Sequence, residues 1–365
     1  MTGDVGAVDA ARDRVRVFEP QPGSTLSGHP LLNGIMEIGR KRIRRNIVAL
    51  PVAVALLVAI MFLEDDVFGA MPLVVIGVLA VVVWGLQVFV YFYAIRPTYG
   101  LRDKPFFEAR PREILVSGRK VSFELPGGGW LVVKLGPAHR ALLAGLRRMW
   151  LVGPDASGRV GMLLPGMVNG SGGRIRTEPA PGSAALPALS RAPAAPKDDP
   201  LLAAYFRSAA RRNVITTVVS FVVAGYLVWN FAGLEAPDAV GDLAVGLLLG
   251  AAGVIVLLSC WGFVLLHRLH RAISAPNWTE LGIRLAGGIQ ANGLIVAGAA
   301  GRVLLPDGRE VAVTLARTNV SLLLTVETTG RLWVLGTPEP GARAYIGLPG
   351  YPLVGTAKFG EVQPM

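Results

Sequence analysis

The sequence is nearly free of charge over long stretches, has a single cysteine, and carries no catalytic signature. One cysteine, Cys260, excludes a disulfide within the chain and a thiolate metal cluster. No phosphate-binding loop, dinucleotide-binding glycine unit, nucleophile elbow or kinase signature is present. His267 and His270 share a helix face, but two ligands without a neighbouring carboxylate or thiolate do not make a metal site. We therefore predict that the chain has no catalytic residue, no cofactor and no metal, and that it is not an enzyme.

The apolar residues are concentrated in four blocks. The chain has 365 residues, of which 52% are hydrophobic, and its mean hydropathy is +0.50. None of the four blocks contains Asp, Glu, Lys, Arg or His, and each is roughly as long as a helix that crosses a hydrocarbon core of ~30 Å. The sequence therefore predicts an α-helical membrane protein with four transmembrane helices in two hairpins. The predicted helices are 46–63 and 71–95 in the first hairpin, and 214–232 and 243–266 in the second.

Basic residues lie beside these blocks, and acidic residues lie in the two short loops between them. Loops 64–70 and 233–242 contain Asp and Glu but no Lys or Arg. Because Lys and Arg near the ends of a span favour the cytoplasmic side, the pattern predicts a multi-pass protein of the plasma (inner) membrane with both termini cytoplasmic. It also predicts anionic inner-leaflet lipids as partners. The residues that set this topology are Arg40, Lys41, Arg42, Arg44, Arg45, Arg207, Arg211, Arg212, Arg268 and Arg271.

The chain repeats itself with a spacing of about 170–180 residues, as five collinear matches indicate. Pro-Leu-Leu followed by Arg-Arg-Asn opens both halves, and Arg-x-Trp-x-x-Gly and Leu-Pro-Gly recur near their ends. We therefore predict a tandem duplication of one unit, a transmembrane hairpin followed by a small β-rich (α+β) cytosolic domain. The matched positions begin at 30 and 200, 44 and 211, 118 and 301, 148 and 331, and 164 and 348.

Local patterns complete the predicted domain organisation. Pro/Ala- and Gly-rich composition indicates an extended, mobile linker over 167–199, which would leave the two halves separate. Residues 322–326 are compatible with either a helix or a strand. The predicted parts are a disordered tail 1–29, amphipathic juxtamembrane helices 30–45 and 200–213, hairpins 46–95 and 214–266, and cytosolic domains 96–166 and 267–365. An equal alternative for the stretch before the first span is that it simply extends that span as one helix.

A few residues inside the apolar blocks are candidates for helix packing. Gly246 and Gly250 form a Gly-x-x-x-Gly pair with Gly253 nearby, which would let another helix approach closely. The alternative is the ordinary tolerance of apolar helices for glycine. Gln87 and Ser259 are candidates for hydrogen bonds between helices.

Three functions remain compatible with this sequence. The first is a membrane-anchored interaction or scaffold protein that presents two cytosolic domains to a protein partner or to a second copy. The second is a component of a transport or channel assembly, and the third is an enzyme at the inner leaflet. Nucleic acid is not a predicted partner, because the basic residues lie beside apolar blocks and do not alternate with aromatic residues.

Overall fold

The computed structural model divides into two compact units. The β-rich unit consists of Met1–Ile38, Pro97–Ser208 and Leu269–Met365, and the helical unit consists of Gly39–Arg96 and Ala209–Arg268. The structure describes residues 15–61, 99–146, 148–155, 157–186, 195–231, 239–291 and 296–361, together with isolated positions between 81 and 92.

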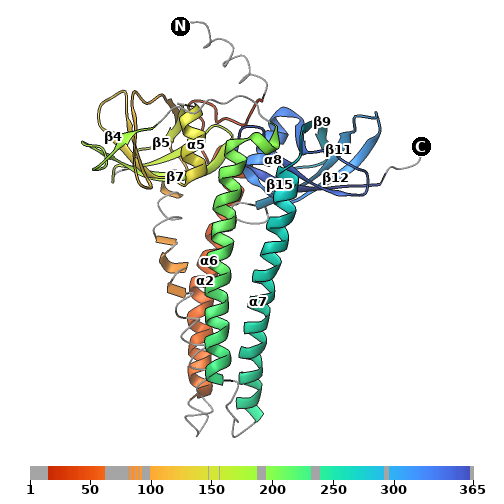
Figure 1. Cartoon of the computed structure of the whole chain (residues 1–365). Coiled ribbons are helices and arrows are strands. Elements are labelled where there is room, and N and C mark those ends of the chain that lie inside the picture. Colours follow the sequence, from red (N-terminus) through yellow and green to blue (C-terminus); the bar gives the residue numbers. More distant parts are fainter. Residues whose placement is uncertain are drawn as a thin grey trace. The chain divides into compact units, whose positions relative to one another are not determined.

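Three long helices supply most of the helical unit. Helix α2 spans Pro30–Met61, α6 spans Pro200–Phe231 and α7 spans Ala239–Ile273 (Figure 1). Both α2 and α6 begin at a proline, which fits the first turn of a helix because its missing N–H needs no partner there. The segments 30–45 and 200–213 are therefore the first turns of long continuous helices, as the alternative interpretation predicted for 30–45, and not separate amphipathic helices.

The prediction of four transmembrane helices is wrong. Over the described residues, none of the helices combines the length and the apolar character that crossing a membrane requires. A crossing helix needs ~20 consecutive apolar residues. The apolar part of α2 follows a cluster of basic residues in the same helix and is described only as far as Met61. Most of the predicted span 71–95 lies outside the described residues.

The same finding corrects the predictions that depended on four spans. The predicted localisation, a multi-pass protein of the plasma (inner) membrane with cytoplasmic termini, is contradicted, and so is the predicted function as a membrane-anchored scaffold. The described part of the chain holds fifteen strands and six helices, one of them the short 3-10 helix Pro196–Asp198. It is therefore rich in β-structure, whereas the prediction made a set of membrane helices its principal feature.

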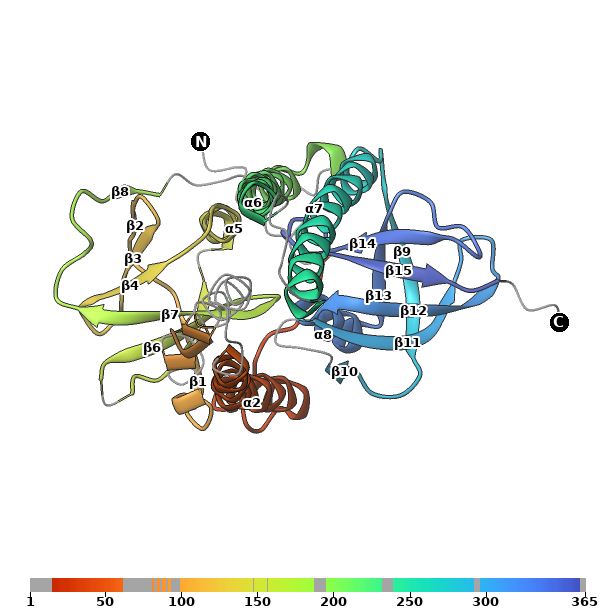
Figure 2. The ribbon, with the colours of Figure 1, turned by 90° about the horizontal axis from the view of Figure 1, so that it is seen from below.

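The first half of the β-rich unit is a sheet with the order β1-β5-β6-β7-β4-β3-β2-β8 (Figure 2). All of its pairings are antiparallel. Helix α5, Pro137–Leu146, lies between β4 and β5 in the sequence, as its amphipathic pattern predicts. The strands are β1 Phe106–Ala109, β2 Ile114–Ser117, β3 Lys120–Glu124, β4 Trp130–Lys134, β5 Met149–Val152, β6 Arg159–Leu164, β7 Met167–Arg176 and β8 Ala184–Ala185.

The second half is a sheet with the order β10-β11-β12-β15-β14-β13-β9, and β9 also pairs with β11. Strands β9, β11, β12, β15, β14 and β13 therefore close into a hydrogen-bonded ring. Helix α8, Val320–Thr329, resolves the open choice at 322–326 in favour of a helix. The strands are β9 Trp278–Leu285, β10 Gln290–Ala291, β11 Val296–Leu304, β12 Glu310–Asn319, β13 Arg331–Leu335, β14 Arg343–Gly347 and β15 Val354–Phe359.

The two halves share one strand order. In both, a hairpin (β3–β4, β11–β12) leads to a helix and then to three further strands, the last of which pairs back with the hairpin. The single strand β9 pairs with β13 through its first part and with β11 through its last part. In the first half two shorter strands, β1 and β2, make the equivalent pairings with β5 and β3. Pro111 lies between β1 and β2, and proline interrupts a strand because it lacks the N–H that the ladder requires.

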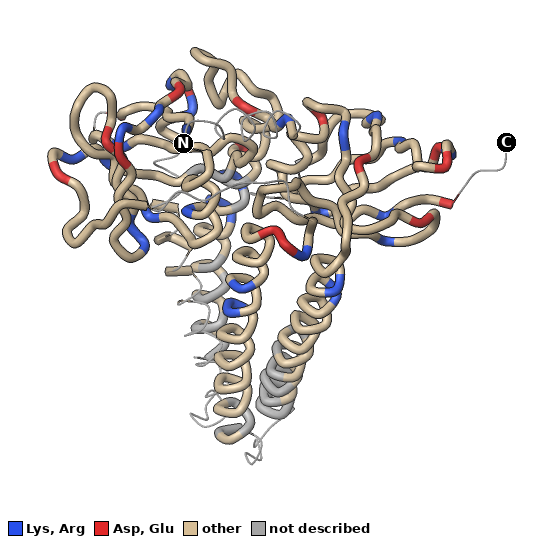
Figure 3. The backbone as a smooth tube through the Cα atoms, turned by 45° about the horizontal axis from the view of Figure 1, so that its top comes forward, with Lys and Arg blue, Asp and Glu red and all other residues tan. Residues whose placement is uncertain are grey.

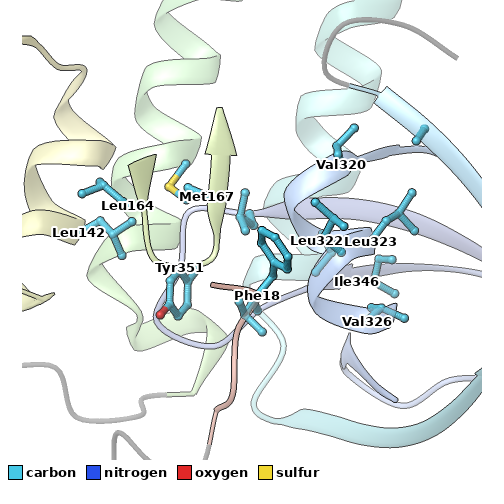
Figure 4. Packing of buried hydrophobic residues seen from close by; sticks show 14 of the residues in the cluster. Phe18, Leu142, Leu164, Met167, Val320, Leu322, Leu323, Val326, Ile346 and Tyr351 are labelled. Atoms are coloured by element: carbon cyan, nitrogen blue, oxygen red, sulfur yellow. The ribbon is translucent and has the colours of Figure 1, made fainter. Parts of the chain in front are cut away.

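A shared hydrophobic core joins the two halves of the β-rich unit. One continuous cluster of buried side chains includes Phe18 from the N-terminal segment, Leu164 and Met167 from the first half, and Leu322 and Tyr351 from the second (Figure 4). Burial of this kind stabilises by roughly 25 cal/mol per Å² of apolar surface. The halves are therefore packed against each other, which the prediction of a mobile linker did not anticipate.

Hydrogen bonds cross the same junction. The backbone N–H of Val168 donates to the Ser321 hydroxyl at 3.0 Å, and the N–H of Phe18 donates to the Thr325 hydroxyl at 3.2 Å. Ser321 and Thr325 lie one turn apart on α8, so that helix presents both hydroxyls to the first half. Val168 belongs to β7, which occupies the first ten residues of the segment predicted to be a linker.

Asp199 connects the start of α6 to the second half of the β-rich unit. Its Oδ1 accepts the N–H groups of Leu201 at 2.8 Å and Leu202 at 3.3 Å, which is an N-cap of α6. Its Oδ2 accepts the N–H of Gly350 at 2.9 Å. Gly350 lies in the turn between β14 and β15 with φ +73°, a conformation that favours glycine. Asp199 is only 3% exposed, and its two carboxylate oxygens accept hydrogen bonds from three backbone N–H groups.

Candidate interaction surface on the helices

Helices α6 and α7 approach closely at Gly262. A Cβ atom added to Gly262 would lie 2.2 Å from Oδ1 of Asn213, so any larger residue would force Asn213 to move. In the part of α6 that belongs to the helical unit, the described side chains that are buried are small or polar, namely Thr217, Ser220 and Ala224. Small side chains allow two helix backbones to approach, and this face of α6 therefore packs inside the helical unit.

From Val214 onward, most of the other described side chains of α6 are exposed and apolar. Trp229 is 87% exposed and Val222 is 65% exposed, although tryptophan and valine are ordinarily buried. At ~100° per residue the exposed apolar positions cover more than half of the circumference of the helix. They are Val214, Ile215, Val218, Val219, Phe221, Val222, Val223, Tyr226 and Trp229.

The other two helices share this property. On α2, Val48, Val52 and Leu56 are exposed at one-turn spacing and form an apolar stripe. On α7 the exposed apolar side chains are Val254, Leu257, Trp261, Phe263, Val264 and Leu265. Patches larger than a few hundred Å² are uncommon on monomeric proteins in water and mark interaction sites. The exposed apolar side chains of α2, α6 and α7 within the helical unit, which we call the apolar surface, are the candidate site.

Cationic side chains border the apolar surface at one end. Arg211 and Arg212 directly precede Asn213 on α6, and Arg268 follows Gly262 on α7, so the contact between Asn213 and Gly262 places these arginines at the same end of the helix pair. The Arg268 guanidinium lies 5.9 Å from the centroid of the Trp261 ring, a cation–π contact. Figure 3 shows that Lys and Arg lie in short stretches of the described parts of the helices.

The predicted basic residues all belong to these helices. Arg40 is half-buried, and the side chain of Arg42 lies outside the described residues. The remainder are exposed: Lys41, Arg44 and Arg45 on α2, Arg207, Arg211 and Arg212 on α6, and Arg268 and Arg271 on α7. Exposed cations next to exposed apolar side chains form an amphipathic surface, with long basic side chains able to reach beyond the apolar region.

The residues predicted to pack one helix against another are not those at the close approach between Gly262 and Asn213. A Cβ atom added to Gly246, Gly250 or Gly253 would meet no described atom within 4 Å. Ser259 is buried, and Gln87 is half-buried with no hydrogen-bond partner for its Oε1 among the described residues. Their role in helix packing stays a prediction. Sequence reasoning missed the close approach at Gly262, which has no Gly-x-x-x-Gly partner to mark it.

Titratable groups in the β-rich unit are shifted by local structure. Hydrogen bonds from Arg309 hold the pKa of Asp307 below its usual range, and the backbone N–H of Arg159 does the same for the pKa of Asp155. Burial raises the pKa of Glu19 in spite of its ion pair with Arg148, and burial lowers the pKa of His139. Each cause is a turn, an ion pair or burial in the fold. Within the described ranges, no group of three or more His, Cys, Asp or Glu side chains is placed to hold a metal ion.

Comparisons with protein-family models, with curated proteins and with solved structures give no match. The candidate function therefore depends on the physical character of the apolar surface and its cationic border alone.

Proposed function

We propose that the protein binds anionic lipid surfaces through the apolar surface of its helical unit and the arginines and lysines beside it. The observation that supports this proposal best is that exposed apolar and exposed cationic side chains adjoin each other on α2, α6 and α7. Acyl chains would cover the apolar side chains, and anionic headgroups would pair with the cations. The proposal assigns no catalytic step to the chain, in keeping with the lack of a catalytic motif in its sequence.

The width of the apolar arc favours lipid over a protein partner. A partner helix covers a narrow stripe of the helix that it contacts, whereas exposed apolar side chains occupy more than half of the circumference of α6. Lipid adapts to a curved surface without requiring shape complementarity. Self-association, in which a second copy covers the apolar side chains, is the competing account.

Electrostatics gives the proposal a magnitude. Each Lys or Arg near an anionic lipid surface contributes about 1 kcal/mol, and the contribution is screened over a Debye length of ~10 Å. Engagement of four of the basic residues would strengthen binding by about 4 kcal/mol, or roughly 10³-fold, relative to a neutral surface. The preference for anionic lipid should therefore be large at low salt and should shrink as salt is raised.

Vesicle flotation of the full-length protein tests the proposal. Vesicles of phosphatidylcholine alone are compared with vesicles that also contain phosphatidylserine, at low and high salt. The double variant Arg211→Gln/Arg212→Gln should lose most of the preference for phosphatidylserine. The matched control Arg309→Gln/Arg331→Gln removes the same charge from exposed ion-paired positions of the β-rich unit and should leave the preference unchanged.

A second pair of variants separates lipid binding from self-association. Val218→Asn/Val222→Asn replaces two exposed apolar side chains of α6 and should weaken binding to both kinds of vesicle. The contrary result has two parts: the protein binds neither kind of vesicle, and it sediments as an oligomer that these substitutions dissociate. In that case the apolar side chains mediate self-association and the lipid proposal is wrong.

A further inference from the structure

Each half of the β-rich unit places two cations directly opposite each other on neighbouring strands. Arg159 of β6 faces Arg174 of β7, and Arg343 of β14 faces Lys358 of β15. The four strands are equivalent in the shared strand order, β6 with β14 and β7 with β15. Both pairs also lie at the same sequence distance from the Leu-Pro-Gly turn that joins their strands. We call them the first and second cation pairs.

Each cation pair costs stability in the free protein. Like charges directly opposite on an antiparallel sheet repel each other. Arg174, Arg343 and Lys358 are exposed and Arg159 is half-exposed. Among the described residues none of the four side chains has a carboxylate oxygen within 4.0 Å, although Asp155 accepts the backbone N–H of Arg159 at 2.9 Å, and this hydrogen bond and the charge of Arg159 both lower the pKa of Asp155. The first pair therefore has one carboxylate nearby, that of Asp155, which also accepts backbone N–H groups, whereas within the described fold neither member of the second pair forms an ion pair.

The surroundings of the pairs leave room for a ligand. The residues next to the first pair on the same face are Gly161 and Gly172. A Cβ atom added to Gly172 would meet nothing within 4 Å, whereas one added to Gly161 would lie 3.3 Å from Leu101, so the open space lies on the β7 side of the pair. Beside the second pair, exposed Thr314 of β12 lies opposite Lys358 and brings a hydroxyl to the same face. A low surface beside two cations suits a small anion.

We propose that each cation pair binds one phosphate group. Side chains opposite each other on antiparallel strands have Cβ atoms about 5 Å apart, so two long cationic side chains can converge on one tetrahedral oxyanion. Guanidinium groups also match phosphate geometry with paired hydrogen bonds. A bound phosphate converts the repulsion within the pair into attraction for the ligand. The inference concerns the β-rich unit and does not depend on the proposed function of the helices.

Two sources could supply the phosphate group, a soluble polyphosphate and a lipid headgroup. Isothermal titration calorimetry of the full-length protein with inorganic pyrophosphate tests the first, and titration with glycerol 3-phosphate, a soluble headgroup analogue, tests the second. The titration that saturates at the lower concentration identifies the source. Saturable binding of either probe supports the proposal, and failure of both to bind overturns it.

Single substitutions then locate the sites. Arg174→Gln and Lys358→Gln should each weaken binding at their own pair by about tenfold or more, since each removes a charge-assisted contact. Arg176→Gln is the matched control, because Arg176 is exposed on the same strand and face as Arg174 but lies opposite Trp130. It should change the affinity by less than about twofold.

Stability in the absence of the anion provides an independent reading. Arg174→Gln removes a repelling charge, so its midpoint of thermal unfolding should stay at or above that of the unsubstituted protein. If Arg174→Gln loses binding while its midpoint of thermal unfolding is unchanged, the loss results from the missing side chain at the site and not from unfolding of the protein. If Arg176→Gln weakens binding as much as Arg174→Gln, the anion responds to net charge and the assignment to the cation pairs is wrong.

Discussion

Asp199 offers the sharpest test of how the first turn of α6 is held within the β-rich unit. Replacing it with alanine removes the N-cap of α6, which costs about 1 kcal/mol. It also leaves the N–H of Gly350 without its acceptor at a part-buried position, which costs about 1–3 kcal/mol. Asp199→Ala should therefore lower the free energy of unfolding by about 2–4 kcal/mol.

A graded series makes the reasoning specific. Asp199→Asn keeps one oxygen to cap α6 but places an NH₂ group against one of the donors, so it should cost about 1–2 kcal/mol. Asp198→Ala, at the exposed neighbouring position, should stay within about 0.5 kcal/mol of the unsubstituted protein. Urea unfolding followed by circular dichroism under identical conditions gives the three values. Equal stability of the Asp199→Ala and Asp198→Ala variants would refute the assigned role of the buried carboxylate.

Three further perturbations probe other parts of the fold. Phe18→Ala should lower the free energy of unfolding by about 3 kcal/mol, because the ring is buried in the shared core; a loss below about 1 kcal/mol in urea unfolding would count against that core. Gly262→Ala should destabilise the helical unit by about 1–3 kcal/mol, and a double-mutant cycle should show that Asn213→Ala removes most of this cost. Burial lowers the pKa of His139, so between that lowered pKa and about 6.5 the unfolded chain binds more protons than the folded protein does. The free energy of unfolding should therefore rise with pH across this window and then level off. In the variant His139→Gln this rise should be smaller, and an unchanged pH dependence would contradict the assignment.

The hairpins and helices of the β-rich unit were accessible from the sequence, because short-range signals define them. Turns at Pro126 and Pro306 predicted the β3–β4 and β11–β12 hairpins, which the structure contains. Residues 322–326 remained open because β-branched neighbours favour a strand. The helix prevails there because Asn319 caps it at one end and Gly330, with φ +64°, ends it at the other.

The junction between the halves could not be predicted from composition. The region 167–199 is rich in glycine and proline, which suggested a linker, yet its first part is β7 because β4 and β6 supply hydrogen-bonding partners on both sides. Phe18 lies in a segment whose polarity suggested disorder, yet it is buried because α8 and the turn at Gly166 offer it a hydrophobic site and two hydrogen bonds. Tertiary partners decide both outcomes, and the local sequence does not encode them.

The candidate surface was foreseen only in part. The sequence shows directly that basic clusters adjoin apolar runs. The prediction that these runs form four transmembrane helices is wrong, because among the described residues no helix is both sufficiently long and sufficiently apolar for a crossing. The cation pairs could not be predicted from the sequence, because Arg159 and Arg174 become neighbours only through the register of β6 and β7. Register between strands depends on turns and buried faces, which one sequence does not specify residue by residue.

The most direct test of the central claim uses the single cysteine of the chain. Cys260 is exposed on α7, beside Trp261 of the apolar surface, so an environment-sensitive fluorophore can be attached there without any substitution. If the apolar surface binds lipid, adding vesicles that contain phosphatidylserine should shift the emission to shorter wavelength and increase its intensity, with a weaker response to phosphatidylcholine alone. Unchanged emission with both kinds of vesicle would contradict the claim.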